Sequence, residues 1–411
     1  MKTCAFCVLC SLFFISPVAA QDAATAAGIA LRTSVKLTGL VFRAPDATQS
    51  SVKRTGAESL LRIRIEPSIR AGADATVTFA YEQQLRVASS ALAVAGASIL
   101  PSHSAAPYRV RQLSWASAEA DGLKWLHEID RASAQFNVRQ AKLTVGRQGV
   151  GWGRGVMFGA VDLFSPFTPL EVDREWRRGV DAVRADIKLA DRSSVDLVGA
   201  FGHDWNRSAV AARLRGYAKR ADFELMVGRR GRDLFGGLSA SAAIAGAEVH
   251  GELAAFRVPR EDWLDAGRTV AKVVVGASYR LPVGSGILAY AEYHYSGFGA
   301  AHPREISARL SNSAYVERYV RGDTQILSKH ALAVIGSYEL SPEISYSGQW
   351  LHNPRDDSGV LVPGLTLTWS DALSMASSVY LPYGAKPAGG ILRSEYGGAS
   401  IAGLVQLRLY L

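Results

Sequence analysis

Cysteine is nearly absent from this sequence and is confined to one end of it. Of the 411 residues only Cys4, Cys7 and Cys10 are cysteines, and nothing after them carries a thiol. This excludes disulfides, cysteine-ligated zinc and thiol nucleophiles from the rest of the chain. The eight histidines are scattered, and no two have the His-x-x-x-His spacing of a helical metal site. We therefore expect neither a metal nor a cofactor.

Long hydrophobic runs are also missing beyond the first twenty residues. No later segment has the roughly 18 consecutive apolar residues that a transmembrane helix needs. With 48% hydrophobic and 20% charged residues, the chain is too polar for a polytopic helical membrane protein and too apolar for a disordered one. The net charge of +9 is spread along the chain and not gathered on a helix, so nucleic acid is not an expected partner.

Residues 1–20 have the composition of a targeting segment. Lys2 precedes an apolar run over residues 4–18, and small residues follow up to Ala20. This order predicts a secretory signal peptide that is cleaved after Ala20. Residues 21–411 would then form one exported domain, and a Gram-negative-type bacterium is the expected source.

The rest of the chain is dominated by short segments in which apolar and polar residues alternate. In Leu61-Arg62-Ile63-Arg64-Ile65-Glu66, three aliphatic side chains fall on one face and three charges on the other. A period of two predicts β-strands with one apolar and one polar face. We expect about 18 strands, and at least about 16. They are placed near 30–42, 59–70, 74–86, 123–134, 138–147, 178–189, 193–203, 206–217, 221–230, 233–244, 246–257, 268–281, 286–298, 329–340, 343–353, 359–369, 371–382 and 397–411.

The connections between these strands alternate between short and long. Turns such as 71–73, 190–192 and 219–220 hold only two or three residues. The long connections all fall on the other side, at 43–58, 87–122, 148–177, 258–267, 299–328 and 383–396. Short periplasmic turns and long extracellular loops are typical of outer-membrane barrels, whereas a sandwich or propeller would mix the two. We therefore predict an all-β fold, a transmembrane antiparallel up-and-down β-barrel, whose closure pairs every backbone group in lipid.

If the apolar faces meet lipid, many basic side chains face the lumen. Rings of Arg and Lys favour anions in a pore, although the same residues could simply brace a wet barrel wall against acidic neighbours. The predicted pore-lining and selectivity residues are Arg62, Arg64, Arg147, Arg154, Arg184, Lys188, Arg213 and Arg215.

The long connection 148–177 is the predicted constriction. It combines aromatic residues, prolines and charges of both signs, a composition that favours folding into the lumen over exposure outside it. The residues singled out in it are Trp152, Asp162, Asp173 and Glu175. Its acids match no calcium-loop spacing, so no metal is predicted there.

Three motifs around this connection resemble a known family. They are Val145-Gly146-Arg147-Gln148, Gly151-Trp152-Gly153-Arg154-Gly155 and Gly179-Val180-Asp181-Ala182-Val183-Arg184. This pattern resembles the alginate-export family and related porin-like barrels of the outer membrane. The resemblance implies an 18-stranded barrel that passes an anionic polymer or solute through an arginine-lined lumen, with Arg147, Arg154 and Arg184 at the family's basic positions.

One strand carries a possible catalytic relay. Glu292, His294 and Ser296 alternate along one face of the predicted strand 286–298, so they could act as orienter, base and nucleophile. The His-Tyr-Ser run resembles an element of outer-membrane lipid hydrolases. The other interpretation is a row of polar residues in the lumen, and we expect no enzyme.

The sequence thus predicts a channel in the cell outer membrane for passive diffusion of small, anionic solutes. The alternatives are an exporter of an anionic polysaccharide and a lipid hydrolase using Ser296. The expected partners are outer-membrane lipid, lipopolysaccharide and the barrel-assembly machinery, which would bind a terminal strand such as 397–411. The solute, the direction of transport and the oligomeric state stay open.

Overall fold

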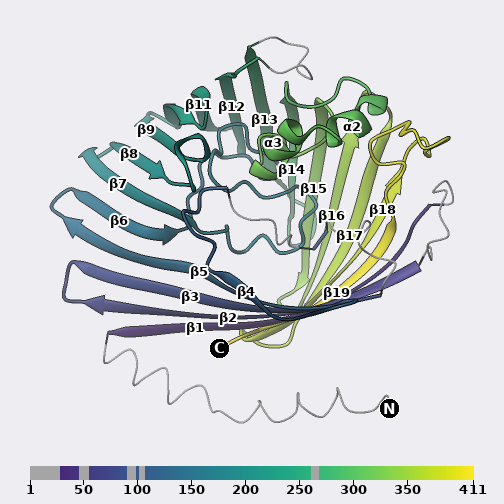
Figure 1. The fold of residues 1–411 in the computed structure, drawn as a ribbon, viewed down its shortest axis with the longest axis horizontal. Helices are drawn as coiled ribbons and strands as arrows, with labels where there is room; N and C mark the ends of the chain where they lie inside the picture. Colours follow the sequence, from purple (N-terminus) through teal and green to yellow (C-terminus); the bar gives the residue numbers. More distant parts are fainter. Residues whose placement is uncertain (1–27, 46–54, 90–98, 101–106, 261–267) are drawn as a thin grey trace.

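The computed structural model describes residues 28–45, 55–89, 99–100, 107–260 and 268–411. The predicted signal peptide at 1–20 lies outside the described residues. The described part is a closed antiparallel β-barrel (Figure 1), because β1 (Ile29–Arg43) pairs with both β2 (Thr55–Ala71) and β19 (Ile401–Tyr410). The predicted fold class is confirmed.

Eighteen strands of the described chain close the barrel. Between β2 and β19 they are β3 (Ala75–Ala88), β5 (Leu123–Val138), β6 (Ala141–Gln148), β7 (Val180–Ala190), β8 (Ser193–Ala200), β9 (Ala209–Ala218), β10 (Ala221–Arg230), β11 (Asp233–Ile244), β12 (Ala247–Arg257), β13 (Thr269–Leu281), β14 (Ile287–Ser296), β15 (His330–Ser341), β16 (Ile344–Asn353), β17 (Ser358–Thr368) and β18 (Leu373–Tyr383).

A further short strand, β4 (Ser114–Ala120), lies where the sequence predicts only loop. It pairs with the first half of β5, with Trp115 opposite His127. The other half of β5 pairs with β6, so β4 extends the wall beyond the end of the shorter β6. Its sequence, Ser-Trp-Ala-Ser-Ala-Glu-Ala, has little apolar alternation, which explains why the period-two pattern misses it.

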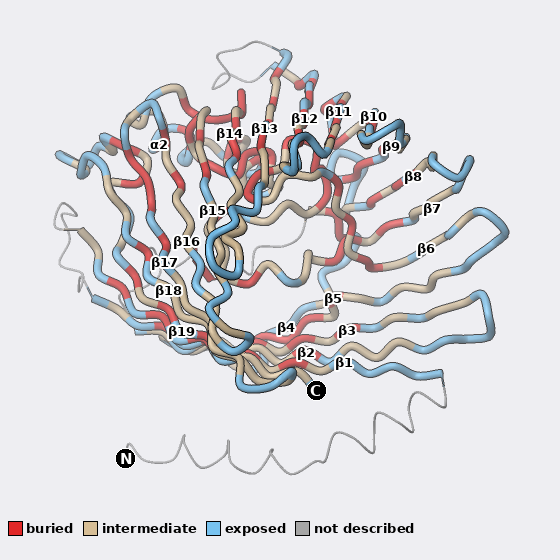
Figure 2. Tube along the Cα trace, turned by 180° about the vertical axis from the view of Figure 1, so that it is seen from behind, coloured by how far each residue is buried: buried red, intermediate tan, exposed pale blue. Residues whose placement is uncertain are grey.

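The predicted alternation is visible in the burial of the strands. On β10, Phe223, Leu225 and Val227 are half exposed on the outer surface, whereas Met226 between them is fully buried inside the barrel. Figure 2 shows the buried residues gathered around the inner segments, and the exposed ones on strand ends and turns. Within the described residues, no helix is long and apolar enough to cross a membrane.

The two ends of the barrel differ as predicted. The short-turn end holds tight turns, and two of them place Lys219 and Ala245 in the left-handed region, with φ of 57° and 49°. The long-loop end carries the longer connections, including two helices that the sequence analysis leaves as loop: α2 (Pro303–Leu310) and α3 (Ser313–Arg321). Asn312 caps α3 by accepting hydrogen bonds from the backbone N–H groups of Ala314 and Tyr315.

Candidate functional site

Residues 149–179 leave the wall at the end of β6 and cross the lumen before they return at β7 (Figure 1). We call them the constriction segment; it corresponds to the predicted loop 148–177. Much of its first half is buried, with a core made of Val150, Trp152, Met157, Phe158, Ala160, Val161, Leu163 and Phe164. The constriction segment therefore forms an apolar core inside the barrel, and polar contacts attach the segment to the wall.

Two glutamates on β12 and β14 hold the first half of this segment. Glu252 accepts hydrogen bonds from the backbone N–H groups of residues 154, 155, 160 and 161, with N–O distances of 2.9 Å for Gly155 and 2.7 Å for Ala160. Glu292 accepts from residues 156–158, at 2.9 Å for Met157. Since β12 and β14 lie far round the barrel from β6, these carboxylates fix the segment to the opposite wall.

Aromatic contacts complete this first anchor. The Trp152 indole N–H donates to Asp196 on β8 at 3.1 Å, and its ring meets Phe164 edge-on with centroids 5.0 Å apart. Phe158 stacks on His294 of β14 at 4.7 Å between ring centroids. Such ring pairs contribute about 0.5–1.5 kcal/mol each beyond the area they bury.

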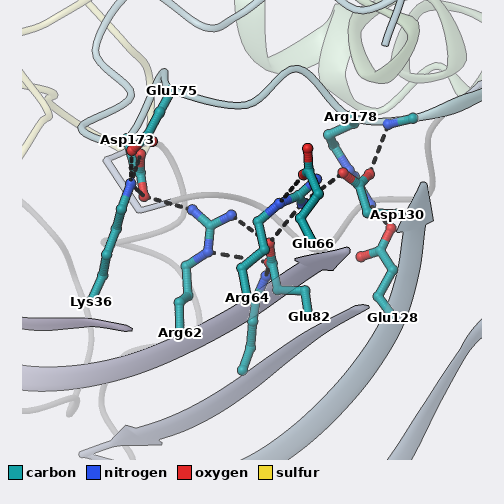
Figure 3. A network of polar contacts seen from close by, with 12 residues as sticks. Lys36, Arg62, Arg64, Glu66, Glu82, Glu128, Asp130, Asp173, Glu175 and Arg178 are labelled. Atoms are coloured by element: carbon teal, nitrogen blue, oxygen red, sulfur yellow. Dashed lines mark hydrogen bonds and ion pairs between the residues drawn. The ribbon is translucent and has the colours of Figure 1, made fainter. Parts of the chain in front are cut away.

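The second half of the segment is held by basic residues of β1 and β2 (Figure 3). The Lys36 ammonium donates to Asp173 at 2.9 Å, and the Arg62 guanidinium donates to the other oxygen of Asp173 at 2.7 Å. Lys36 also pairs with Glu175 and lies 3.9 Å from the centre of the Trp176 ring. The segment is thus anchored at two separate parts of the wall.

The two buried acids of the segment have opposite pKa shifts. Burial disfavours the charged form of Asp173, but Arg62 and Lys36 outweigh it and hold the pKa of Asp173 below its ordinary value. For Asp162, burial is the larger effect and raises its pKa, although Arg177 pairs with it. Asp173 is therefore the acid whose ionised form supports the segment.

We expect the anchor at Asp173 to be independent of pH from neutrality down to about pH 4. A carboxylate with a lowered pKa stabilises the folded state above its ordinary pKa and loses this contribution as the pH falls through the lower, folded value. Channel conductance should therefore rise only in stronger acid, where protonation of Asp173 weakens the anchor of the constriction segment. Asp173→Asn should show the higher conductance at neutral pH and lose the acid response. Glu171→Gln should keep it, because the half-buried Glu171 bonds only to Thr168 of the same segment among the described residues. An unchanged acid response in Asp173→Asn would contradict this role.

Every predicted pore-lining residue has an acidic partner in the structure. Arg62 and Arg64 share the network of Figure 3 with Glu82. Arg184 and Arg213 both hold Asp196. The remaining pairs are Arg147 with Asp181, Arg154 with Glu224 at 3.7 Å, Lys188 with Asp191, and Arg215 with Asp186. Lys188 and Arg215 lie near the short-turn end, away from the constriction.

Several arginine–carboxylate pairs of the lumen and the constriction segment are unequal in their exposure. The side chains of Arg154, Arg177, Arg178 and Arg184 are 24% to 34% exposed, whereas their partners Glu224, Asp162, Glu128 and Asp196 are only 0% to 9% exposed. In these four pairs the guanidinium meets the solvent and the carboxylate does not, although Arg154 also lies 3.7 Å from Asp222, whose side chain is 46% exposed. The opposite order holds for Lys36 and Glu175, where the acid is the exposed member.

Glu292, His294 and Ser296 do not form a relay. Glu292 is occupied by the constriction segment and by His250, whose Nε2 lies 3.1 Å from it. Both ring nitrogens of His294 and the hydroxyl of Ser296 are buried without a hydrogen-bond partner among the described residues. In the described part of the chain, no three His, Cys, Asp or Glu side chains are grouped as a metal site.

A second inward segment, residues 297–329, packs against the first. The Gln325 side chain accepts from the Gly159 N–H at 2.7 Å and donates to the Phe167 carbonyl at 2.8 Å. The charged centre of this second inward segment is Asp323, which is fully buried among Arg230, Arg318 and Arg321. Sequence reasoning missed this cluster, as it missed Trp176, because local periodicity carries no signal for contacts between distant loops.

Comparisons with known proteins bear on the fold. No protein-family model and no curated protein matches the chain. Among solved structures of Occ/Opd outer-membrane porins, OccAB1 of Acinetobacter baumannii has a TM-score of 0.54 and 9% identity, covering 93% of this chain and 96% of that one. OccK9 (OpdG) of Pseudomonas aeruginosa has a TM-score of 0.54 and 10% identity, covering 93% and 98%. At such low identities the structural match shows a shared barrel fold alone; the resemblance to the alginate-export family stays a prediction.

Proposed function

We propose that this protein is a channel of the bacterial outer membrane for passive diffusion of small, anionic solutes. The observation that carries the proposal is the constriction segment, which crosses a closed barrel and is anchored to the wall by Glu252, Glu292 and Asp173. A segment held this firmly sets the width and the charge of the remaining passage. Pore width and wall charge are the properties by which diffusion channels select solutes.

The anionic preference is supported by the unequal pairs. The guanidinium is the more exposed member in the pairs of Arg178 with Glu128 and of Arg184 with Asp196, so a solute would meet positive charge there. Arg154 adds a further exposed guanidinium, between the buried Glu224 and the exposed Asp222. Charge of one sign in a low-dielectric passage raises the local concentration of counter-ions. The arginines therefore brace the wall and attract anions at the same time.

Placement in the outer membrane is supported by the outward rows of the strands. The closed sheet leaves no free edge, and side chains such as Leu225, Leu238 and Leu253 project from its outer surface with about half of their area exposed. Only helices and closed barrels pair every backbone group within lipid. Outer-membrane lipid and the barrel-assembly machinery are the partners that this placement implies.

We expect the refolded protein to form stable conductance steps in a planar bilayer, with an anion-selective reversal potential under a KCl gradient. Replacing Arg154, Arg178 and Arg184 together by glutamine should move the reversal potential to zero or to the sign of a cation-selective pore. The buried acids keep a basic partner, since Arg213 still holds Glu224 and Asp196, and Arg109 still holds Glu128. Asp222 loses Arg154, but its side chain is 46% exposed and its charge stays hydrated.

The matched control replaces Arg139, Arg192 and Arg220 by glutamine. All three are exposed in turns at the short-turn end, so the same charge is removed outside the constriction. This control should keep the parent's selectivity. An equal shift in both triple variants, or none in either, would remove the assignment of selectivity to the constriction, and a folded barrel without conductance would contradict the channel itself.

A further inference from the structure

A basic cleft opens at the long-loop end, away from the constriction. It has a volume of about 720 Å³, within the range of pockets that bind small molecules. Its wall is formed by the β10–β11 turn, the end of β12, the residues flanking the β12–β13 connection, and α3. Six arginines line it against two acidic residues, Asp233 and Glu317.

Four of these arginines have no acidic partner among the described residues. Arg318 and Arg321 are bound to Asp233. The other four are exposed and form no ion pair within the described ranges: Arg232, Arg257, Arg260 and Arg268. The arginines predicted to line the pore all have an acidic partner, so this cluster differs from them. Positive charge gathered on one small surface is suited to an anion that carries more than one charge.

The cleft continues the outer, apolar surface of the barrel. On β12, Arg257 follows Leu253 and Ala255 on the outward row and stands opposite the exposed Leu234 of β11. The neighbouring β10 repeats this order, because Leu225 and Val227 lead to Arg229, whose guanidinium lies 5.1 Å from the exposed Trp205 ring. Aliphatic rows that end in arginine and tryptophan mark the level where acyl chains give way to headgroups.

We propose that this cleft binds the phosphate groups of an outer-leaflet glycolipid such as lipid A. The outward rows below it would contact the acyl chains, and the four arginines would bind the phosphate oxygens. Guanidinium groups pair with phosphate through two parallel N–H···O bonds, which makes arginine the fitting residue for such a headgroup. The inference rests on the outer-membrane placement proposed above, but it does not depend on conduction.

The test measures binding of diphosphoryl lipid A in detergent micelles to the full-length folded protein by native mass spectrometry. Replacing Arg232, Arg257, Arg260 and Arg268 by glutamine should weaken binding about tenfold or more. The control replaces Arg139, Arg192, Arg220 and Arg280, four exposed arginines of the short-turn end, and should bind as the parent does. Heat-modifiable mobility on gels confirms that both variants are folded barrels.

Three results would overturn the assignment. The first is equal binding by the two fourfold variants. The second is equal affinity of the parent for lipid A from which both phosphates have been removed. The third is displacement of lipid A by inorganic phosphate at equal concentration, which would make the cleft a site for free phosphate. Conductance of the cleft variant is recorded in parallel, so that loss of lipid binding with intact anion selectivity separates this site from the proposed channel.

Discussion

Replacing Glu252 and Glu292 together by alanine should raise the single-channel conductance severalfold and weaken ion selectivity. These two carboxylates accept seven backbone hydrogen bonds from the constriction segment. A hydrogen bond to a charged group contributes about 1.5–3 kcal/mol, so their combined loss exceeds what the Trp152 and Phe158 contacts can replace. The segment should then leave the opposite wall, while the strand ladders keep the barrel closed.

The conductance of this double variant is compared in planar bilayers with that of Glu248→Ala combined with Glu343→Ala. The control removes the same charge from exposed positions on β12 and beside β16, where no contact with the constriction segment is made among the described residues. It should keep the parent's conductance. If the Glu252 and Glu292 variant also kept it, the segment would be held by its apolar core alone, and the two glutamates would have no anchoring role.

The barrel itself could be predicted from the sequence because its determinants are local. Alternation as in residues 61–66 fixes which face of a strand is apolar, and short turns such as Lys219-Arg220 identify one end of the barrel. Both signals need only neighbouring residues. The closure of β1 on β19 then follows, since an open edge would leave backbone groups unpaired.

The contents of the lumen were only partly predictable. An inward segment at 148–177 was expected from its composition, and Asp173 and Trp152 do lie in it against the wall. Its partners could not be identified, because Glu252 and Lys36 are distant in sequence and look like ordinary polar residues of a strand. The charge pattern identified basic residues of the wall but left open whether they attract anions or brace acidic neighbours, because burial of their partners decides which charge remains exposed. The partners of the segment and the burial of each charge are decided only when the barrel closes.

Asp323→Asn should destabilise the second inward segment by about 3–5 kcal/mol, the usual effect of removing one partner from a buried ion pair. Burial disfavours the charge of Asp323, but three arginines overcome this and hold its pKa well below the ordinary value. Arg318 and Arg321 would keep Asp233 as a partner. Arg230 is 1% exposed and pairs only with Asp323 among the described residues, so its charge would be left buried and uncompensated.

The measurement is limited proteolysis of the folded protein, followed as the rate of cleavage within residues 297–329. Cleavage should accelerate in Asp323→Asn while the barrel resists the protease. Adding Arg230→Met should restore much of the protection, because the methionine removes the unpaired charge and keeps an apolar contact with Phe256, over whose ring the guanidinium now lies at 4.7 Å. Failure of the second substitution to restore protection would show that Asp323 acts through Arg318 and Arg321 instead. Recovery would show that a single buried pair joins the wall at β10 to the segment that packs on the constriction.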